Sequence, residues 1–313
     1  MKKTVGLFIF FVSFAFNVIA CLNGDSKILK NGIYLYEDYK GKIPYGHSFH
    51  IDNDNFKSAF REIDSLYKST KDLDYLSDKG LLLILLKEYG KAINIYLEIE
   101  KMKPGRYSTA SNIGTAYELI GDNENALKWI KKSIELDSKS HYESEWIHVK
   151  ILEAKIDSQK SINSLSLINT DFGTDSLPKT SLSKEALTKL GDAIYFQLNE
   201  RISFIKPKDK IVAQLLFDLA NITCLLKNEH DGMPTFDKAK EYGFDSTIVE
   251  MRKIALNQAS NKYWADLRAK GNIEVEKKYP NNDKLYVGVA LISIILIVIV
   301  VIFIRRKKIK ITR

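Results

Sequence analysis

Two adjacent stretches of sequence decide the fold: LDYLSDKGLLLILLKEYGKAINIYLEIEKMKPGR (73–106) and YSTASNIGTAYELIGDNENALKWIKKSIELDSKS (107–140). The two stretches are equal in length, and each carries glycine at its eighth position, as Gly80 and Gly114, with an alanine twelve residues later. Small residues at two such points let two helices cross closely, while bulky residues fill the space around the crossing. The repetition therefore predicts two successive helical hairpins.

This pattern resembles the tetratricopeptide repeat (TPR), a pair of helices that recurs with a period of about 34 residues. The residues expected at the helix crossings are Gly80, Ala92 and Tyr96 in the first copy, Gly114, Tyr117 and Ala126 in the second, and Gly232, Phe236 and Ala239 in a weaker third copy. The third copy covers 213–246, where Pro234 has to lie near the first turn of the second helix. The resemblance implies an all-α solenoid of TPR-like helical hairpins that binds other proteins.

The sequence outside the repeats divides by composition and periodicity. Residues 22–51 contain several glycines and tyrosines and predict an extended segment laid on the first helices, where a short hairpin could form. We expect an irregular N-terminal segment (21–54), a TPR block with flanking helices (55–156), a loop rich in small polar residues (157–182) and a second helical block that contains the third copy (183–278).

Two apolar segments predict that the chain is exported and anchored in a membrane. Residues 1–20 begin with Lys2 and Lys3 and continue as an apolar run, which is typical of a signal peptide. Residues 285–304 carry no charge, and a helix of this length spans about 30 Å, the thickness of the hydrocarbon core. The basic tail 305–313 should stay in the cytoplasm. We expect a single-pass protein of the cytoplasmic (inner) membrane, with its N-terminal domain exported to the periplasmic side.

The residues around Cys21 leave two alternatives open. Val18-Ile19-Ala20-Cys21 resembles the lipobox of bacterial lipoproteins, in which the cysteine is lipidated and becomes the new N-terminus. The same four residues also fit an ordinary signal peptide that is cut before a cysteine. With the repeats and both apolar segments, the layout resembles membrane-anchored bacterial TPR proteins with an exported solenoid.

The distribution of charge argues against nucleic-acid binding. The formal net charge is +8, but eight of the 47 basic residues flank the two apolar segments. The region between Cys21 and Lys284 therefore holds 39 basic and 39 acidic residues. Nucleic-acid-binding domains carry a clustered basic excess, which this region lacks.

No motif in the sequence predicts catalysis, a cofactor or a metal. Among the five histidines, His47 and His50 are three residues apart, without the spacing of a known zinc site. P-loop and nucleophile-elbow motifs are missing from the sequence. We predict that the protein is not an enzyme and needs no cofactor; the alternative is an enzyme centred on His47 and His50.

The resemblance also implies where a partner would bind. The first helix of each TPR pair lines the concave face of a solenoid. The candidate groove residues on these helices are Ser77 and Leu81 in the first copy, Ser111, Thr115 and Glu118 in the second, and Phe217 and Asn221 in the third. We predict a membrane-tethered scaffold that binds a protein or peptide in this groove. The main alternative is an envelope signalling subunit coupled to a membrane partner through residues 285–304.

Overall fold

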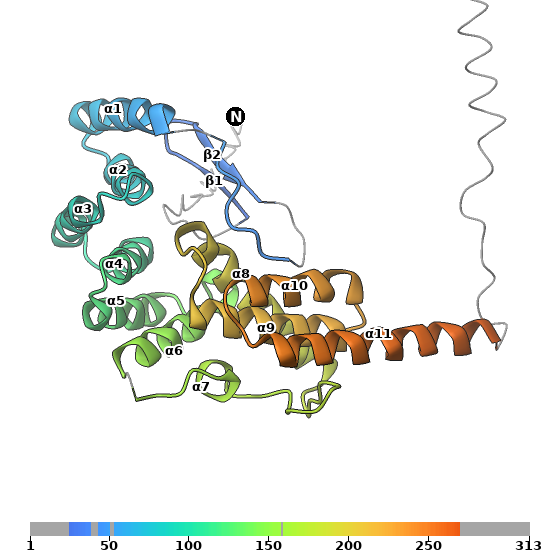
Figure 1. The fold of residues 1–313 in the computed structure, drawn as a ribbon. Coiled ribbons are helices and arrows are strands. Elements are labelled where there is room, and N and C mark those ends of the chain that lie inside the picture. The colour runs from blue at the N-terminus through green and yellow to red at the C-terminus, as the bar shows by residue number, and fades with distance from the viewer. Residues whose placement is uncertain (1–24, 39–42, 51–52, 158, 270–313) are drawn as a thin grey trace, which may run out of the picture. The chain divides into compact units, whose positions relative to one another are not determined.

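A computed structural model describes residues 25–38, 43–50, 53–157 and 159–269 (Figure 1). The predicted signal peptide, Cys21, the predicted transmembrane segment 285–304 and the basic tail lie outside these residues. The described part is mostly helical and is consistent with a TPR-like solenoid. Within that part, none of the helices is both long enough and apolar enough to cross a membrane.

Two helical hairpins coincide with the two clear repeats. Helices α2 (Leu73–Leu85) and α3 (Tyr89–Met102) form the first pair, and α4 (Tyr107–Leu119) and α5 (Asn123–Leu136) form the second. Each bound of the second pair lies one full repeat after the corresponding bound of the first. The period read from the sequence is thus the period of the helices themselves.

The glycine of each repeat lies where its two helices cross. A Cβ atom on Gly80 would lie 2.7 Å from the ring of Tyr96, and one on Gly114 would lie 2.5 Å from the side chain of Ile130. Ala92 is fully buried, as are Tyr96 and Ala126. Tyr117 is half-buried between two apolar clusters. The small residues therefore give room to a bulky residue of the second helix, because the backbones approach closely there.

This packing predicts a loss of stability for Gly80→Ala. The ring of Tyr96 cannot easily move aside, since its hydroxyl donates to the Ser77 carbonyl and accepts from Asn112 Nδ2, both at 3.0 Å. We expect the free energy of unfolding to fall by about 2 kcal/mol, the usual scale of core overpacking. Urea unfolding followed by circular dichroism measures the change.

Gly90→Ala is the matched control, because a Cβ at this position of α3 would meet no atom within 4 Å. Alanine is the better helix former, so this variant should gain about 0.5–1 kcal/mol. Equal effects of the two substitutions would contradict the crossing described above.

A third helical hairpin, α9 (Lys210–Leu225) and α10 (Glu229–Glu241), shares the turn of the first two. The second residue after each first helix has a positive φ: 62° at Lys87, 84° at Gly121 and 66° at Lys227. In all three turns its amide donates to the carbonyl three residues earlier, and the next amide donates to the carbonyl five residues earlier. This common turn relates the third pair to the first two hairpins.

The packing residues expected in the third pair lie at its crossing. Phe236 and Ala239 are fully buried, and Gly232 faces Cys224 so closely that a Cβ would overlap the sulfur. Pro234 lies in the second turn of α10, one turn later than the sequence analysis expected. The helix tolerates it there at the loss of one backbone hydrogen bond.

Further helices flank these pairs. Helix α1 (Asn53–Thr70) packs on α2, α6 (Glu145–Ile156) packs on α5, and α8 (Lys184–Phe204) packs on α6 and α9. Helix α11 (Ser246–Ala269) follows α10. The chain divides after Gln258, and the described part of the second unit, residues 259–269, is the end of α11.

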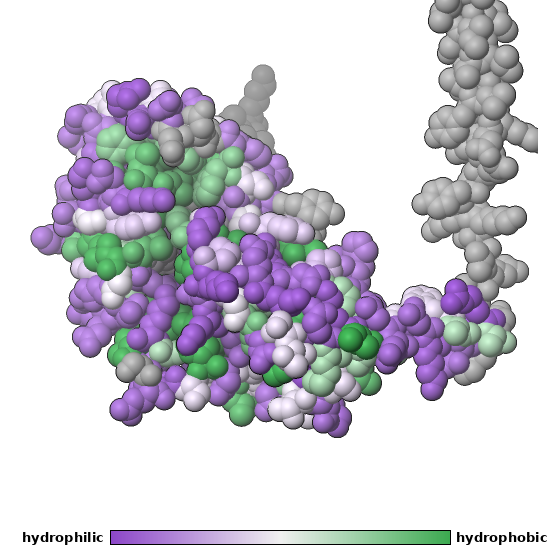
Figure 2. Space-filling model, in the orientation of Figure 1, coloured by the Kyte–Doolittle hydropathy of each residue, from purple (hydrophilic) through white to green (hydrophobic). Residues whose placement is uncertain are grey.

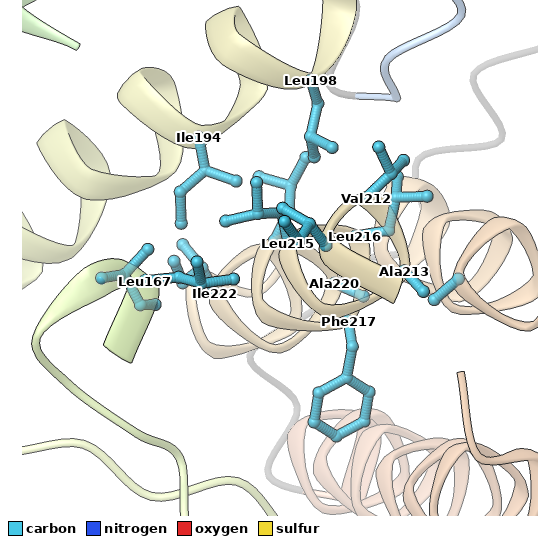
Figure 3. Close-up of a cluster of buried hydrophobic side chains, with 14 of the residues drawn as sticks. Leu167, Ile194, Leu198, Val212, Ala213, Leu215, Leu216, Phe217, Ala220 and Ile222 are labelled. Carbon is cyan, nitrogen blue, oxygen red and sulfur yellow. The ribbon is translucent and has the colours of Figure 1, made fainter. Parts of the chain in front are cut away.

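One apolar core lies around α9. Ile194 and Leu198 of α8 point toward Leu215 and Leu216 of α9, with Leu167 beside them (Figure 3). These five side chains are fully buried. Helix α9 is covered on several sides, since Ile211–Cys224 are all buried. This core fixes α8, one of the helices that line the candidate site.

The region predicted as the loop 157–182 contains a short helix, α7 (Ser164–Ile168). Leu167, Ile168 and Phe172 are buried in the core around α9, so the prediction of a plain loop is incomplete. The guanidinium of Arg252 donates to the Phe172 carbonyl at 3.1 Å and to the neighbouring Gly173 carbonyl. Three apolar side chains among many polar ones are enough to bring this segment into the core.

The N-terminal segment folds back onto the helices. Strands β1 (Ser26–Ile28) and β2 (Tyr34–Glu37) form a small antiparallel sheet, and residues 43–50 run on to α8 (Figure 1). We call the described residues 25–38 and 43–50 the N-terminal strap. Leu29, Leu35 and Tyr36 of the strap are buried in the same core as the helices α1–α3.

Candidate functional site

The structure buries most of the predicted groove residues. The exposed fraction is 0% for Ser77, Leu81 and Asn221, 1% for Ser111 and 7% for Phe217. Leu81 shares a core with the N-terminal strap, and Asn221 accepts a hydrogen bond from Arg252 Nη1 at 2.7 Å. An open groove along all three first helices is therefore wrong for this conformation, because other parts of the chain cover it.

Two of the predicted residues, Thr115 and Glu118, line a pocket with a volume of about 310 Å³. Its walls come from α3, α4, α6, α8 and the segment that follows α8. The lining is polar at Thr115, Glu118, His148, Lys155, Glu200, Arg201 and Asp209, and apolar or aromatic at Tyr89, Leu119, Phe204 and Ile205. We call it the α4–α8 pocket.

Glu118 is the centre of a buried ionic cluster in this pocket. Its carboxylate accepts from Arg201 Nη1, Lys155 Nζ and His148 Nε2, each at 2.6 Å. Burial alone would raise the pKa of Glu118, but the charges of Arg201 and His148 hold it well below its usual range. The carboxylate therefore stays ionised and ties α4 to both α6 and α8.

The cluster continues away from the pocket through a second carboxylate. Glu145 Oε2 lies 3.3 Å from His148 Nδ1, and Oε1 contacts His141 Nδ1, whose other ring nitrogen meets the Tyr107 hydroxyl. Although burial would lower the pKa of His148, the charge of Glu118 and hydrogen bonds to both carboxylates raise it. The protonated imidazole is thus favoured between two carboxylates.

An unusual turn places His141 in this cluster. Three consecutive residues, His141, Tyr142 and Glu143, have positive φ angles of 52°, 53° and 56°. Such a conformation costs about 1–2 kcal/mol for each L-residue that is not glycine. The contacts of His141 with Glu145 and Tyr107 help to offset this cost.

Glu200 gives the pocket a second carboxyl group, whose pKa is shifted in the opposite direction. Burial raises the pKa of Glu200, in contrast to the lowered pKa of Glu118. Within the described residues, Arg201 Nε has no hydrogen-bond partner. The α4–α8 pocket thus places charged and polar side chains beside an apolar wall, an arrangement suited to holding a polar group of a partner.

The cationic side of this pocket could not be predicted from the sequence. Glu200 and Arg201 lie in an amphipathic stretch whose charged residues are ordinarily solvated, and Lys155 lies near the end of α6. Nothing in their local spacing indicates that they meet Glu118, which is 83 residues before Arg201. His141 and His148 flank Trp146 in the sequence, where nothing indicates their carboxylate partners Glu118 and Glu145.

His47 and His50, the residues of the alternative enzyme hypothesis, make contacts within the N-terminal strap. His47 Nδ1 lies 2.8 Å from Asp38 Oδ2, and the His47 ring stacks on Tyr36 at 4.1 Å. His50 is exposed and lies beside the ring of Tyr34. These contacts stabilise the strap.

Comparison with known proteins supports this description of the hairpins. A family model described as a tetratricopeptide repeat matches residues 108–140. The match supports a TPR protein. It covers the hairpin α4–α5, which contributes Thr115 and Glu118 to the pocket. TPR repeats are typically non-catalytic modules for protein–protein interaction. No curated protein matches the chain.

Proposed function

We propose that this TPR protein is a scaffold that binds a protein or peptide partner at the α4–α8 pocket. The observation that carries the proposal is the position of Thr115 and Glu118. They are the two predicted groove residues that line a pocket, and they belong to the hairpin matched by the TPR family model. The site presents polar groups beside an apolar wall, as peptide-binding surfaces do.

Most of the face shown in Figure 2 is hydrophilic, and a continuous hydrophobic group lies near α1 and α2. Affinity would then come from a few well-placed side chains inserted into the pocket, with the polar rim excluding water around them. Lys155, which is less buried than Arg201, is the charged residue best placed to meet an incoming group.

The scaffold would be held at the outer face of the cytoplasmic membrane. The supporting observations are the uncharged run 285–304, the basic tail after it and the signal-like residues 1–20. Lipid on Cys21 would add a second anchor. The full-length protein should stay with membranes after alkaline carbonate washing and should lose this property when 285–313 is deleted together with Cys21→Ala. Release of the full-length chain by carbonate would refute the tether.

Capture of partners from native membranes tests the pocket. The tagged full-length chain is compared with Thr115→Arg, which fills the pocket, and with Ile120→Arg, which changes an exposed residue outside the pocket lining. We expect a partner to be lost from Thr115→Arg and kept by Ile120→Arg, with circular dichroism showing that both variants fold. Retention of the same partner by both would exclude the pocket as its binding site.

A further inference from the structure

The N-terminal strap binds helix α2 through buried ionic contacts. Lys27 Nζ lies 3.6 Å from Asp78 Oδ1, and both residues are almost fully buried. The backbone amide of Lys30 donates to Asp78 Oδ2 at 2.5 Å, and its ammonium group lies 3.3 Å from Asp72 and from Asp74. Two lysines of the strap are thus bound by three carboxylates, those of Asp74 and Asp78 in α2 and of its N-cap Asp72.

The other end of the strap binds helix α8 through its backbone. The amides of Tyr45 and Gly46 donate to Asn199 Oδ1 at 3.2 and 2.9 Å, and the amide of His47 donates to Ser203 Oγ at 2.8 Å. Side chains that hold successive backbone amides recognise an extended chain whatever its side chains are. The strap is therefore held as a bound peptide would be.

Between these ends, the strap fills the place expected for a partner. Leu29, Leu35 and Tyr36 lie in one core with Leu81 of α2. Leu81 and its neighbour Ser77 are the groove residues that the TPR pattern assigns to the first pair. The groove of this pair exists, and its occupant is a segment of the same chain.

The strap has little stability of its own. Its sheet consists of strands of three and four residues with a register shift between Lys27 and Ile28, and a two-stranded hairpin is marginal by itself. Burial raises the pKa of Asp78 despite the nearby Lys27, so closing the strap over this carboxylate carries a desolvation cost. The contacts with α2 and α8 therefore hold the strap in place.

We propose that the strap is an exchangeable resident ligand of α2 and α8. Its place is taken by an extended segment of a partner protein that presents a lysine to Asp78 and apolar side chains at the sites of Leu35 and Tyr36. The incoming segment replaces each contact by a similar one, so the exchange requires only that its affinity exceed that of the strap. The strap contributes no residue to the lining of the α4–α8 pocket, although Phe204 of that lining packs against the strap's core. The proposal rests on the proposed function only in assigning partner binding to this TPR protein.

Binding of a strap peptide tests the exchange. The probe is a fluorescent synthetic peptide of residues 25–50, titrated against the full-length wild type and against Lys27→Ala, which weakens the resident strap and leaves Asp78 in place. We expect the Kd of the peptide to be at least tenfold lower with Lys27→Ala, because a larger fraction of this variant is open. A peptide carrying Lys27→Glu should fail to bind.

Lys57→Ala is the matched control, since it removes an exposed lysine of α1 that pairs only locally with Asp54. Its Kd for the peptide should equal that of the wild type. The proposal would be overturned if the peptide bound Lys27→Ala and the wild type with equal affinity. It would also be overturned if the Lys27→Glu peptide bound as tightly as the unchanged peptide.

Hydrogen exchange of the wild type gives a test that does not depend on a variant. The amides of Asp38 and His50, which are bonded within the strap, should exchange at least tenfold faster than the slowest amides of α4. Exchange of strap and α4 amides at one common rate would show that the strap opens only with global unfolding. Thr115→Arg should leave binding of the strap peptide unchanged. The proposal about the strap and the proposal about the pocket can therefore be refuted independently.

Discussion

Replacing Glu118 by alanine should lower the free energy of unfolding by about 3–5 kcal/mol, the scale for removing one partner from a buried ionic cluster. The carboxylate accepts from Arg201, Lys155 and His148, and its side chain is 7% exposed. Its loss leaves buried positive charge uncompensated at the junction of α4, α6 and α8. Urea unfolding at neutral pH, monitored by circular dichroism, measures the effect.

Two controls separate this result from a general effect of charge removal. Glu250→Ala breaks the exposed pair with Lys240 and should cost less than about 1 kcal/mol. In a double-mutant cycle, Glu118→Ala and Arg201→Met should be strongly non-additive, because each removes the partner of the other. Additive losses, or equal losses for Glu118 and Glu250, would contradict the cluster.

Replacing Asp218 by asparagine should remove a large pH dependence of stability. Burial raises the pKa of Asp218 to about 7 from an ordinary value of 3.8. The folded state then binds a proton that the unfolded state has released, so the free energy of unfolding falls as pH rises from about 4 to about 7. A shift of this size corresponds to about 4 kcal/mol.

The surroundings of Asp218 favour the substitution. Oδ1 accepts from Ser164 Oγ at 2.6 Å and from Gln214 Nε2 at 3.1 Å, and an asparagine oxygen can keep both bonds. We expect the variant to match the wild type near pH 4 and to be more stable at pH 8. Asp237→Asn, at an exposed ion pair with Lys253, is the control. A variant that is less stable than the wild type at pH 8, with an unchanged pH profile, would refute this assignment.

The repeats could be predicted because their determinants are local and periodic. Gly80 and Gly114 mark the helix crossings. Because the residue pattern recurs from one copy to the next, the helices begin and end at the same positions in both copies. The third pair was harder to recognise because its small residue at the crossing lies at Gly232 of the second helix and Pro234 interrupts its helical pattern.

The candidate site could be predicted only in part because its contacts are distant in sequence. Lys27 meets Asp78, and Tyr45 meets Asn199 across 154 residues, without a period that links them. The same holds for Glu118 and Arg201. The position of a residue within a repeat indicates whether it faces the concave side. Which distant segment covers that residue is decided by contacts that form only in the folded chain.

Photo-crosslinking in cells tests whether a partner binds at the α4–α8 pocket. A benzophenone amino acid is placed at Leu119, which lines the pocket, or at the adjacent Ile120, which does not. We expect one discrete protein adduct from position 119 and none of that adduct from position 120. The same adduct from both positions, or from position 120 alone, would contradict this expectation.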